Sequence, residues 1–382
     1  MKLLIAADIF PPESGGPATY SVTLANELTK LGVEVKIVSL NPNSDVSVVT
    51  CPVFSVHYKN KLLRYAEYFW LLFKHAKDVD VVYAMGPVNA GLPALKASRL
   101  RRKKFVVKVV GDYAWEQGAV RFGVTTSIDE FQKQKKGFNF VGLLRRIEAW
   151  VVRYADQVIT PAHYLKKMVM GWGVKEQKIT VVYNAVEFKD MEPKVHKGER
   201  WLVSVSRLLP WKGMDALIGV MTRLSKIDKY NDVRLKIIGD GPQMDSLKKQ
   251  VIEGNIASRV ELVGNKNRIE TLSYIHGADL ILLNSGYEGL SHFLLEALSF
   301  NRPILASNCG GNSEIIIKNE TGLLFDFNDS KGIEDKIKQF LDGSVKISNN
   351  LLRSNERIRF FKQFTVQTMI SETRELLEKV CN

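Results

Sequence analysis

The chain has 382 residues, of which 45% are hydrophobic and 25% are charged, as in ordinary soluble globular proteins. No apolar run approaches the roughly 20 residues that cross a bilayer, and Cys51, Cys309 and Cys381 lack the spacing of a disulfide framework or a zinc site. Disulfide scaffolds and integral membrane proteins are therefore excluded, and we expect two domains, a reducing cytoplasmic location and at most peripheral membrane contact.

The net charge of +13 is concentrated in the first half of the chain. Met1–Ala185 contains 26 lysines and arginines against 15 aspartates and glutamates, whereas the remainder contains 28 against 26. This asymmetry predicts that the first half faces something anionic, such as a membrane surface, a phospholipid-like acceptor or nucleic acid.

Short β-branched runs alternate with helical patterns through the first half. The expected strands are Lys2–Ala7, Val35–Leu40, Val53–His57, Val79–Ala84, Phe105–Val110, Gln157–Thr160 and Ile179–Val182. Two clear helical patterns lie between them, Thr19–Leu31 and Leu92–Arg102. Such alternation predicts a parallel sheet covered by helices.

The alternation lapses in a charged, proline-containing stretch, Glu187–Arg200, which we interpret as a linker. It then resumes with strands at Leu202–Ser206, Arg234–Ile238, Val260–Val263, Leu280–Leu283 and Ile304–Ala306. The helices expected between these strands are Met214–Ser225, Met244–Glu253, Ile269–His276 and Ser291–Ser299. We expect α/β domains at 1–190 and 199–350, and C-terminal helices at 351–382 that pack back towards the first domain. Ligands of such sheets bind beyond the carboxyl ends of the strands, so the site is expected in the cleft between the domains.

The most informative segment runs from Tyr287 to Leu298 and carries two carboxylates eight residues apart. Glu288 follows an apolar strand and Glu296 lies inside a helix, whose first turn presents unpaired backbone N–H groups to an anion. Carboxylates accept hydrogen bonds from hydroxyl groups. The pattern therefore favours a ligand with both phosphates and hydroxyls; the alternative is a solvated pair of glutamates.

Two cations and a glycine pair complete the candidate site. Arg207 ends a strand and Lys212 begins a helix, a placement that suits a diphosphate leaving group, although both could be solvated surface cations. Gly15 and Gly16 follow the first strand and allow close backbone approach, or form only a flexible turn. Because no G-x-G-x-x-G pattern occurs there, a nicotinamide enzyme is not expected.

These motifs, in their order along the chain, resemble the retaining glycosyltransferases of family 4. The matching segments are Pro11–Gly16, Asn184–Val186, Arg207–Gly213, Gly239–Pro242, Glu288–Glu296, Asn308–Gly311 and Thr321–Leu323. The resemblance covers essentially the whole chain. It implies a GT-B fold, in which two Rossmann-like parallel-sheet domains face a deep inter-domain cleft, the first for the acceptor and the second for the nucleotide-sugar donor.

The resemblance also implies a role for each matching residue. Arg207 and Lys212 would hold the donor diphosphate, Glu296 the ribose, and Glu288 the donor sugar near the reacting carbon. The further donor-binding residues would be Gly15, Gly16, Gly264, Asn265, Lys266, Leu290, Ser291 and His292. Asp112 would take the place of a histidine that faces sugar or acceptor in many relatives.

The expected activity is transfer of a hexose, with retention, from a UDP- or GDP-sugar to a glycan or lipid-linked acceptor in cell-surface polysaccharide or glycolipid synthesis. We expect no metal and no cofactor, and front-face attack with the leaving phosphate taking the acceptor proton. The family has glycine where this chain has Ser291, and this difference bears on which sugar is transferred. The alternatives are a nucleotide-sugar epimerase of the same architecture and a non-catalytic nucleotide-sugar-binding paralogue.

Basic and aromatic side chains are mixed at Lys59–Lys74 and Lys133–Arg146, and Arg101–Lys104 adds a third basic cluster. This mixture suits a phospholipid headgroup layer; the alternative is core helices with a solvated basic edge. No nucleic-acid-binding motif is present, so nucleic acid is not an expected partner. We expect the inner face of the cell membrane, and neutralising Lys133, Lys135 and Lys136 should abolish vesicle binding.

Overall fold

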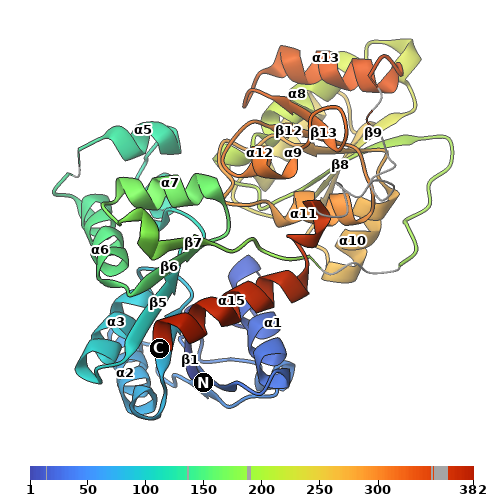
Figure 1. The fold of residues 1–382 in the computed structure, drawn as a ribbon. Coiled ribbons are helices and arrows are strands. Elements are labelled where there is room, and N and C mark those ends of the chain that lie inside the picture. Colours follow the sequence, from blue (N-terminus) through green and yellow to red (C-terminus); the bar gives the residue numbers. More distant parts are fainter. Residues whose placement is uncertain (14, 136, 187–190, 346, 348–359) are drawn as a thin grey trace. The chain divides into compact units, whose positions relative to one another are not determined.

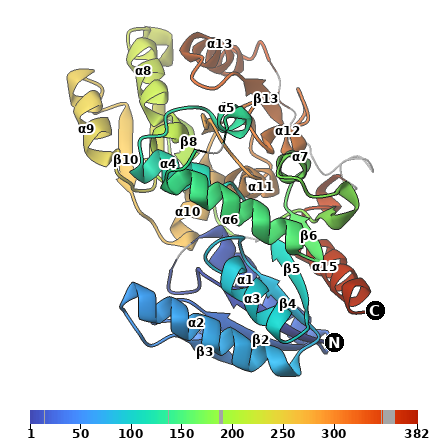
Figure 2. The ribbon, with the colours of Figure 1, turned by 90° about the vertical axis from the view of Figure 1, so that its left-hand side faces the viewer.

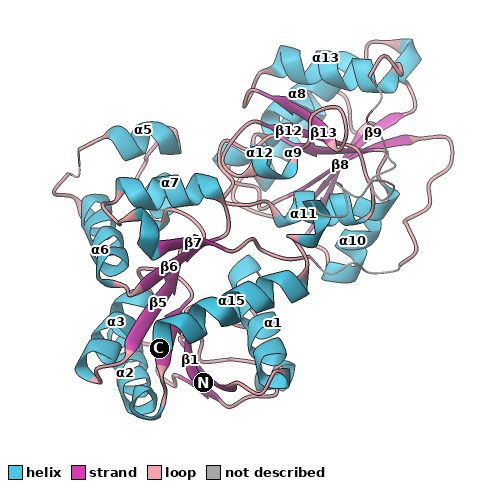
Figure 3. Cartoon of the chain, in the orientation of Figure 1, coloured by secondary structure: helices cyan, strands magenta, loops and turns pink. Residues whose placement is uncertain are grey.

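The structure is a computed structural model that describes the chain except for residues 14, 136, 187–190, 346 and 348–359. The chain forms two compact units (Figure 1): unit 1 comprises Met1–Asn184 and Val366–Asn382, and unit 2 comprises Ala185–Thr365. Each unit is a parallel β-sheet flanked by helices (Figure 3). The prediction of two Rossmann-like parallel-sheet domains is confirmed.

The sheet of unit 1 has the strand order β3-β2-β1-β4-β5-β6-β7. The strands are β1 (Lys2–Ala7), β2 (Glu34–Ser39), β3 (Val53–Ser55), β4 (Val81–Ala84), β5 (Lys104–Lys108), β6 (Gln157–Thr160) and β7 (Ile179–Val181). In the central strand, Leu3 is in register with Val35 of β2 and with Val81 of β4. Leu3–Ala7 is fully buried, as expected for a parallel strand covered on both faces.

Helices cover both faces of this sheet. They are α1 (Gly16–Lys30), α2 (Lys61–His75), α3 (Gly91–Leu100), α4 (Tyr113–Arg121), α5 (Ile128–Lys133), α6 (Phe140–Tyr154), α7 (His163–Gly171) and α15 (Val366–Cys381). The C-terminal helix α15 contacts α1, β4 and β5, so unit 1 is completed by the end of the chain. On the opposite face, α3 contacts both α2 and α6 (Figure 2).

The sheet of unit 2 has the strand order β10-β9-β8-β11-β12-β13. Its strands are β8 (Arg200–Val205), β9 (Val233–Ile238), β10 (Val260–Gly264), β11 (Leu280–Leu283), β12 (Ile304–Ser307) and β13 (Gly322–Phe325). Its helices are α8 (Met214–Leu224), α9 (Met244–Glu253), α10 (Arg268–Gly277), α11 (His292–Ser299), α12 (Asn312–Ile315) and α13 (Ser330–Leu341). Leucines from four strands, Leu202, Leu235, Leu280 and Leu305, form the centre of its core.

The stretch interpreted as a linker is packed against unit 2 where it is described. The backbone N–H of Lys194 donates to the carbonyl of Ser273 at 3.0 Å, and the Lys194 ammonium lies 3.9 Å from the centroid of the Tyr274 ring. The His196 ring hydrogen-bonds the carbonyls of Glu199 and Gly277. Residues 187–190 of the interpreted linker, and 351–359 of the expected C-terminal helix, lie outside the described residues.

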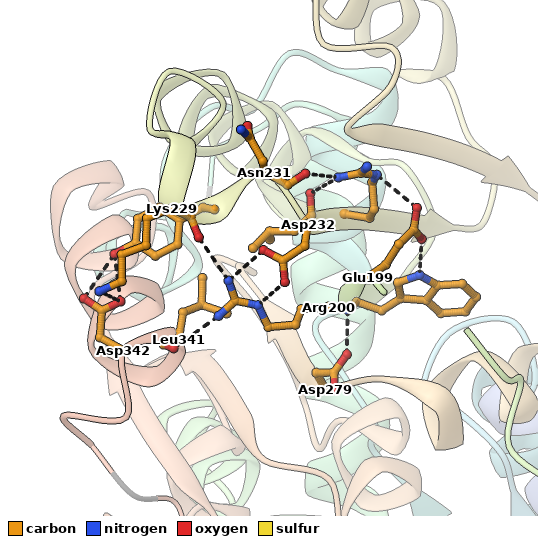
Figure 4. A network of polar contacts seen from close by, with 12 residues as sticks. Glu199, Arg200, Lys229, Asn231, Asp232, Asp279, Leu341 and Asp342 are labelled. Carbon is orange, nitrogen blue, oxygen red and sulfur yellow. Dashed lines mark hydrogen bonds and ion pairs between the residues drawn. The ribbon is translucent and has the colours of Figure 1, made fainter. Parts of the chain in front are cut away.

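A polar network ties together the amino end of the unit 2 sheet (Figure 4). The Arg200 guanidinium donates to both oxygens of Asp232, at 2.5 and 2.8 Å, and to the carbonyl of Leu341 at the end of α13. The backbone N–H of Trp201 donates to Asp279 at 2.7 Å. These contacts join elements at the strand edge opposite to the predicted site, so we assign them a structural role.

Across the part of the chain that the structure describes, no helix is both long and apolar enough to traverse a lipid bilayer.

Candidate functional site

The predicted cluster in unit 2 forms at the carboxyl end of its sheet, where β8 and β11 lie side by side. Lys212, after β8, and Glu288, after β11, form an ion pair with 2.5 Å between Nζ and Oε1. Their side chains are only 15% and 14% exposed. Because partial burial strengthens such a pair, each side chain holds the other in a defined position.

Arg207, the other predicted cation, has an exposed side chain. Within the described residues no ion pair to its guanidinium is recorded, whereas its carbonyl accepts hydrogen bonds from Ser206 and Leu209. The structure thus brings Lys212, and not Arg207, into contact with Glu288. An exposed guanidinium at a strand end can still reach an anionic ligand.

The position of Glu288 is fixed through its backbone by the glycine pair of the Asn308–Gly311 motif. The N–H of Gly311 donates to the Glu288 carbonyl at 3.0 Å. Gly310 has a φ of 58°, and a Cβ there would overlap that same carbonyl oxygen. Only glycine combines this conformation with such close approach. The motif therefore holds the backbone of Glu288 in place.

Asn284 is a structural residue of the site that sequence reasoning did not assign. It is fully buried, and its amide donates to the Gly213 carbonyl at 2.9 Å and to Asn328 Oδ1 at 2.8 Å. Its Oδ1 accepts from the N–H of Asn328 at 3.0 Å. Asn284 therefore fixes the loop that carries Lys212 relative to the loop that carries Glu288.

The second predicted carboxylate, Glu296, has a partner that was not predicted. Arg268, the first residue of α10, lies with one guanidinium nitrogen 2.9 Å from Glu296 Oε1. The Glu296 side chain is 12% exposed, whereas that of Arg268 is 49% exposed. The contact joins α10 to α11, so it depends on tertiary packing; the only sequence signal is an arginine at the start of a helix after the Gly264–Lys266 loop.

The start of α11 differs in detail from the expectation. Ser291 is its N-cap, and the Ser291 hydroxyl accepts a hydrogen bond from the N–H of Leu294 at 3.3 Å. Leu290 and Ser291 are buried, while His292 is partly exposed. The serine that replaces the family's glycine therefore caps a helix. The donor-binding role of Ser291 stays a prediction.

The Gly264–Lys266 loop begins at the end of β10, next to the carboxyl end of β9. Gly264 ends β10 with a φ of 77°, and its carbonyl accepts from the N–H of Gly239 at 2.9 Å. Asn265 is exposed, and the Lys266 ammonium lies 3.7 Å from Glu270. The loop is thus anchored by backbone hydrogen bonding and leaves polar side chains at its surface.

In unit 1, the glycine pair opens the first helix. Gly15 is the N-cap of α1, with a φ of 154°, and its carbonyl accepts from the N–H of Thr19 at 3.1 Å. Gly16 is the first residue of the helix, three residues earlier than the pattern predicts. Ser14, just before the pair, lies outside the described residues.

Asp112 is the N-cap of α4 and is buried. One of its oxygens accepts from the N–H of Trp115 and the other from the amide of Gln132, both at 2.6 Å. Glu148 of α6 accepts from the next two N–H groups, those of Tyr113 and Ala114. Burial raises the pKa of Asp112 and holds that of Glu148 well above its usual range. Helix capping is the role that these contacts give Asp112, and its catalytic role stays a prediction.

No group of three or more His, Cys, Asp or Glu side chains with the placement of a metal site occurs among the described residues.

Comparison with known proteins gives two family matches that follow one another along the chain. The family described as glycosyltransferase family 4 matches residues 14–189, and glycosyl transferases group 1 matches residues 186–358. The fold and the carboxyl-edge cluster define a protein of the GT-B class. The chain belongs to the family 4 type of GT-B glycosyltransferases, as the sequence motifs predicted.

Individual relatives are distant. The glycogen synthase of Mycobacterium tuberculosis is 28% identical over 60% of this chain, and the match covers 56% of that synthase, little more than half its length. The N-acetyl-alpha-D-glucosaminyl L-malate synthase of Bacillus anthracis is 26% identical over 97% of this chain and 96% of its own. The crystal structure of Anabaena Alr3699/HepE with UDP-glucose superposes with a TM-score of 0.77, at 19% identity, over 99% of this chain and 100% of that one, a likeness of fold.

Proposed function

We propose that this chain is a retaining glycosyltransferase that moves a hexose from a UDP- or GDP-sugar to a glycan or lipid-linked acceptor in cell-surface polysaccharide or glycolipid synthesis. The observation that carries the proposal is the Lys212–Glu288 ion pair at the carboxyl edge of the unit 2 sheet, with Glu296 eight residues further on. Family membership supports it, as does a solved protein of the same fold that was crystallised with UDP-glucose.

The donor would lie along the carboxyl ends of β8, β10 and β11. Lys212 and Arg207 would bind the diphosphate as a point charge and a planar fork. Glu296 would accept hydrogen bonds from the ribose hydroxyls, in place of part of its contact with Arg268. The Gly264–Lys266 loop would frame the nucleobase.

The proposed chemistry breaks the bond between the anomeric carbon and the diphosphate oxygen, which leaves with the electron pair. Lys212 stabilises the negative charge that develops on this oxygen, and no metal ion is required. The acceptor oxygen attacks the same face and forms the new glycosidic bond, while its proton passes to the departing phosphate oxygen. Glu288 stays paired with Lys212 and binds sugar hydroxyls, so its role is orientation and charge stabilisation.

The front-face mechanism is a hypothesis with a direct test. It is motivated by the contacts of the two candidate nucleophiles, each within its own unit: Glu288 is paired with Lys212 in unit 2, and Asp112 caps α4 in unit 1. Mass spectrometry of enzyme quenched during turnover of a slow fluorinated donor should show no covalent adduct. A glycosyl group attached to Glu288 or Asp112 would contradict the mechanism.

Nucleotide binding tests the donor site separately from turnover. Titration calorimetry with UDP, GDP and ADP should show binding of one diphosphate, weakened about 10- to 100-fold in Lys212→Ala because a charge-assisted hydrogen bond is lost. Lys229→Ala is the matched control, since this lysine pairs with Asp342 at the opposite edge of the sheet. Absence of binding by all three nucleotides, or unchanged affinity in Lys212→Ala, would count against the proposal.

A lipid-linked acceptor is supported by the outer helical face of unit 1. Trp70, Leu100 and Tyr154 of α2, α3 and α6 are each more than half exposed. A hollow of about 390 Å³ between these helices is lined mainly by apolar surface, and Lys96 and Arg99 are among its lining residues. Its lining residues are Phe69, Leu95, Lys96, Arg99, Leu100, Trp150 and Tyr154. We propose that this face contacts an anionic phospholipid surface.

A further inference from the structure

A group of polar side chains at the carboxyl end of the unit 1 sheet has received no role so far. Asp8 directly follows β1, and Asn89 lies in the connection between β4 and α3. The strand order β3-β2-β1-β4-β5 places β1 beside β4, where the order of the strands reverses. In parallel sheets this reversal opens a crevice at the carboxyl edge, and ligands bind there.

The Asp8 carboxylate has an unused acceptor in this position. Its Oδ1 is shielded from solvent and has no hydrogen-bond partner among the described residues. Leaving a carboxylate oxygen buried and unpaired is costly, because its hydration is lost without replacement. A ligand group that donates a hydrogen bond would remove this cost.

Backbone and side-chain donors orient Asp8. Its carboxylate accepts from the backbone N–H groups of Asp8 and Ile9 and from the Asn89 amide. The Tyr65 hydroxyl in turn donates to Asn89 Oδ1 at 2.8 Å. The strand end itself is fixed by the Tyr68 hydroxyl, which donates to the carbonyl of Ala7 at 3.2 Å. The chain of contacts from Tyr65 through Asn89 therefore sets the direction in which Asp8 presents its acceptor.

Partial burial at this position favours a neutral ligand group. Burial, the largest cause, raises the pKa of Tyr65 to about 12, and Tyr113 and Asp8 act in the same direction. Burying a charged group costs more than burying a hydroxyl group, and a hydroxyl group can donate to Oδ1 of Asp8. A neutral hydroxyl donor therefore suits this position better than an ammonium group.

We propose that Asp8, oriented by Asn89 and Tyr65, is a specificity-determining residue that binds a hydroxyl group of a polyhydroxy acceptor. This inference rests on the proposed glycosyltransferase function, for which unit 1 would hold the acceptor. The site takes a neutral sugar or polyol moiety, and Asp8 acts by positioning it.

Binding of simple glycosides tests this site without a donor. Saturation-transfer NMR on the full chain would use methyl glycosides of glucose, galactose, mannose and N-acetylglucosamine at millimolar concentration. At least one should bind the wild-type protein saturably, and Asp8→Ala and Asn89→Leu should weaken it at least about tenfold. Asp78→Ala, which removes an exposed carboxylate of the same unit, is the matched control.

Two further measurements keep the outcomes distinct. Asp8→Ala should bind nucleoside diphosphates as tightly as the wild-type protein. If the wild-type protein binds no nucleoside diphosphate, the proposed donor site fails and the proposed role of Asp8 is not affected by that result. If Asp8→Ala does not fold, Asp8→Asn keeps the side-chain size and should still weaken the glycoside. Equal glycoside affinity in the folded Asp8 variant and the wild type, or no glycoside binding by the wild type, would overturn the inference.

Discussion

Lys212 and Glu288 combine two requirements in one contact. Both side chains are about 85% removed from solvent, so removal of one partner leaves the other charge poorly solvated. The same proximity places a cation beside a carboxylate, where a diphosphate and a sugar could be bound together. Arg268 and Glu296 repeat the arrangement 2.9 Å apart, with a more exposed cation that is freer to move when a ligand arrives.

At the same scale, Asp8 predicts a specific pH dependence of stability. Burial, the largest cause, raises its pKa from 3.8 to about 6. Between these values the folded protein holds a proton that the unfolded chain has released, so this group makes the free energy of unfolding fall as pH rises. The full effect is about 3 kcal/mol.

Asp8→Asn removes this titration. The difference in unfolding free energy between variant and wild type, followed by urea denaturation, should shift by up to about 3 kcal/mol in favour of the variant between pH 3.5 and 7. Exposed Asp78→Asn should show no such shift. A difference that stays constant over this pH range would contradict the raised pKa of Asp8.

At the scale of elements, α4 depends on two acidic side chains for its first turn. Asp112 and Glu148 together accept hydrogen bonds from three consecutive N–H groups, those of residues 113–115. Glu148→Ala leaves two of these donors buried without a partner. The expected loss is about 2–4 kcal/mol of unit 1 stability.

Hydrogen exchange at the start of α4 measures this loss locally, and nucleotide affinity of unit 2 should not change. Glu148→Gln retains one hydrogen-bond acceptor and should therefore lose less stability than Glu148→Ala. Unaltered exchange of α4 in Glu148→Ala would show that capping by Glu148 contributes little.

The turn at Gly310 predicts a second element-scale effect. A Cβ at this position would overlap the Glu288 carbonyl, and the φ of 58° is unfavourable for alanine. Gly310→Ala should displace the loop of Glu288 and reduce turnover at least about tenfold, with an added cost of about 1–2 kcal/mol in stability.

Gly343→Ala serves as the control, because Gly343 also has a positive φ but no atom within 4 Å of the added Cβ. Gly343→Ala should lose a similar amount of stability from the positive φ and keep full turnover. Equal turnover in the two variants would show that close packing at Gly310 does not position Glu288.

Much of the element pattern could be predicted because the strands are short, mostly apolar runs that alternate with helical patterns. The ranges Lys2–Ala7, Gln157–Thr160, Leu280–Leu283 and Met244–Glu253 match the structure end to end. The start of α1 was placed too late, because the glycine–proline start of the helix lacks the usual apolar period. Strand β13 and helix α13 were not assigned.

For the candidate site, local motifs predicted single residues, and tertiary contacts remained hidden. The Lys212 and Glu288 motifs lie 76 residues apart, yet family resemblance brought them together, and the structure places them in contact. Nothing local to Arg268 or Asn284 marks their contacts with Glu296 and Gly213, since both contacts depend on neighbouring loops. The capping roles of Asp112 and Ser291 were likewise invisible before their partners were placed.

At the scale of the whole molecule, the uneven charge predicts salt-sensitive membrane binding. Unit 1 contains most of the excess positive charge, and Lys96 and Arg99 are among the residues that line the hollow between α2, α3 and α6. Sedimentation with phosphatidylglycerol vesicles should recover the protein. Recovery should fall several-fold, as an order of magnitude, between about 0.05 and 0.5 M salt, because salt screens the attraction between the basic surface and the anionic lipid. Phosphatidylcholine vesicles should recover little.

Two groups of variants separate the contributions to this binding. Trp150→Ser with Lys96→Glu alters the described hollow, whereas neutralising Lys133, Lys135 and Lys136 removes charge before α6; Lys136 lies outside the described residues. Both should reduce recovery, and Lys229→Ala in unit 2 should not. Equal recovery of all variants would argue against a membrane-facing unit 1.

The most direct measurement of the central claim is release of nucleoside diphosphate from UDP-, GDP- and ADP-sugars, in EDTA, with and without a lipid extract. The account predicts lipid-stimulated release from one donor, reduced at least about 100-fold in Glu288→Gln, since this change removes the charge that pairs with Lys212. Release that persists undiminished in Glu288→Gln, or no release from any donor by the wild-type protein, would contradict it.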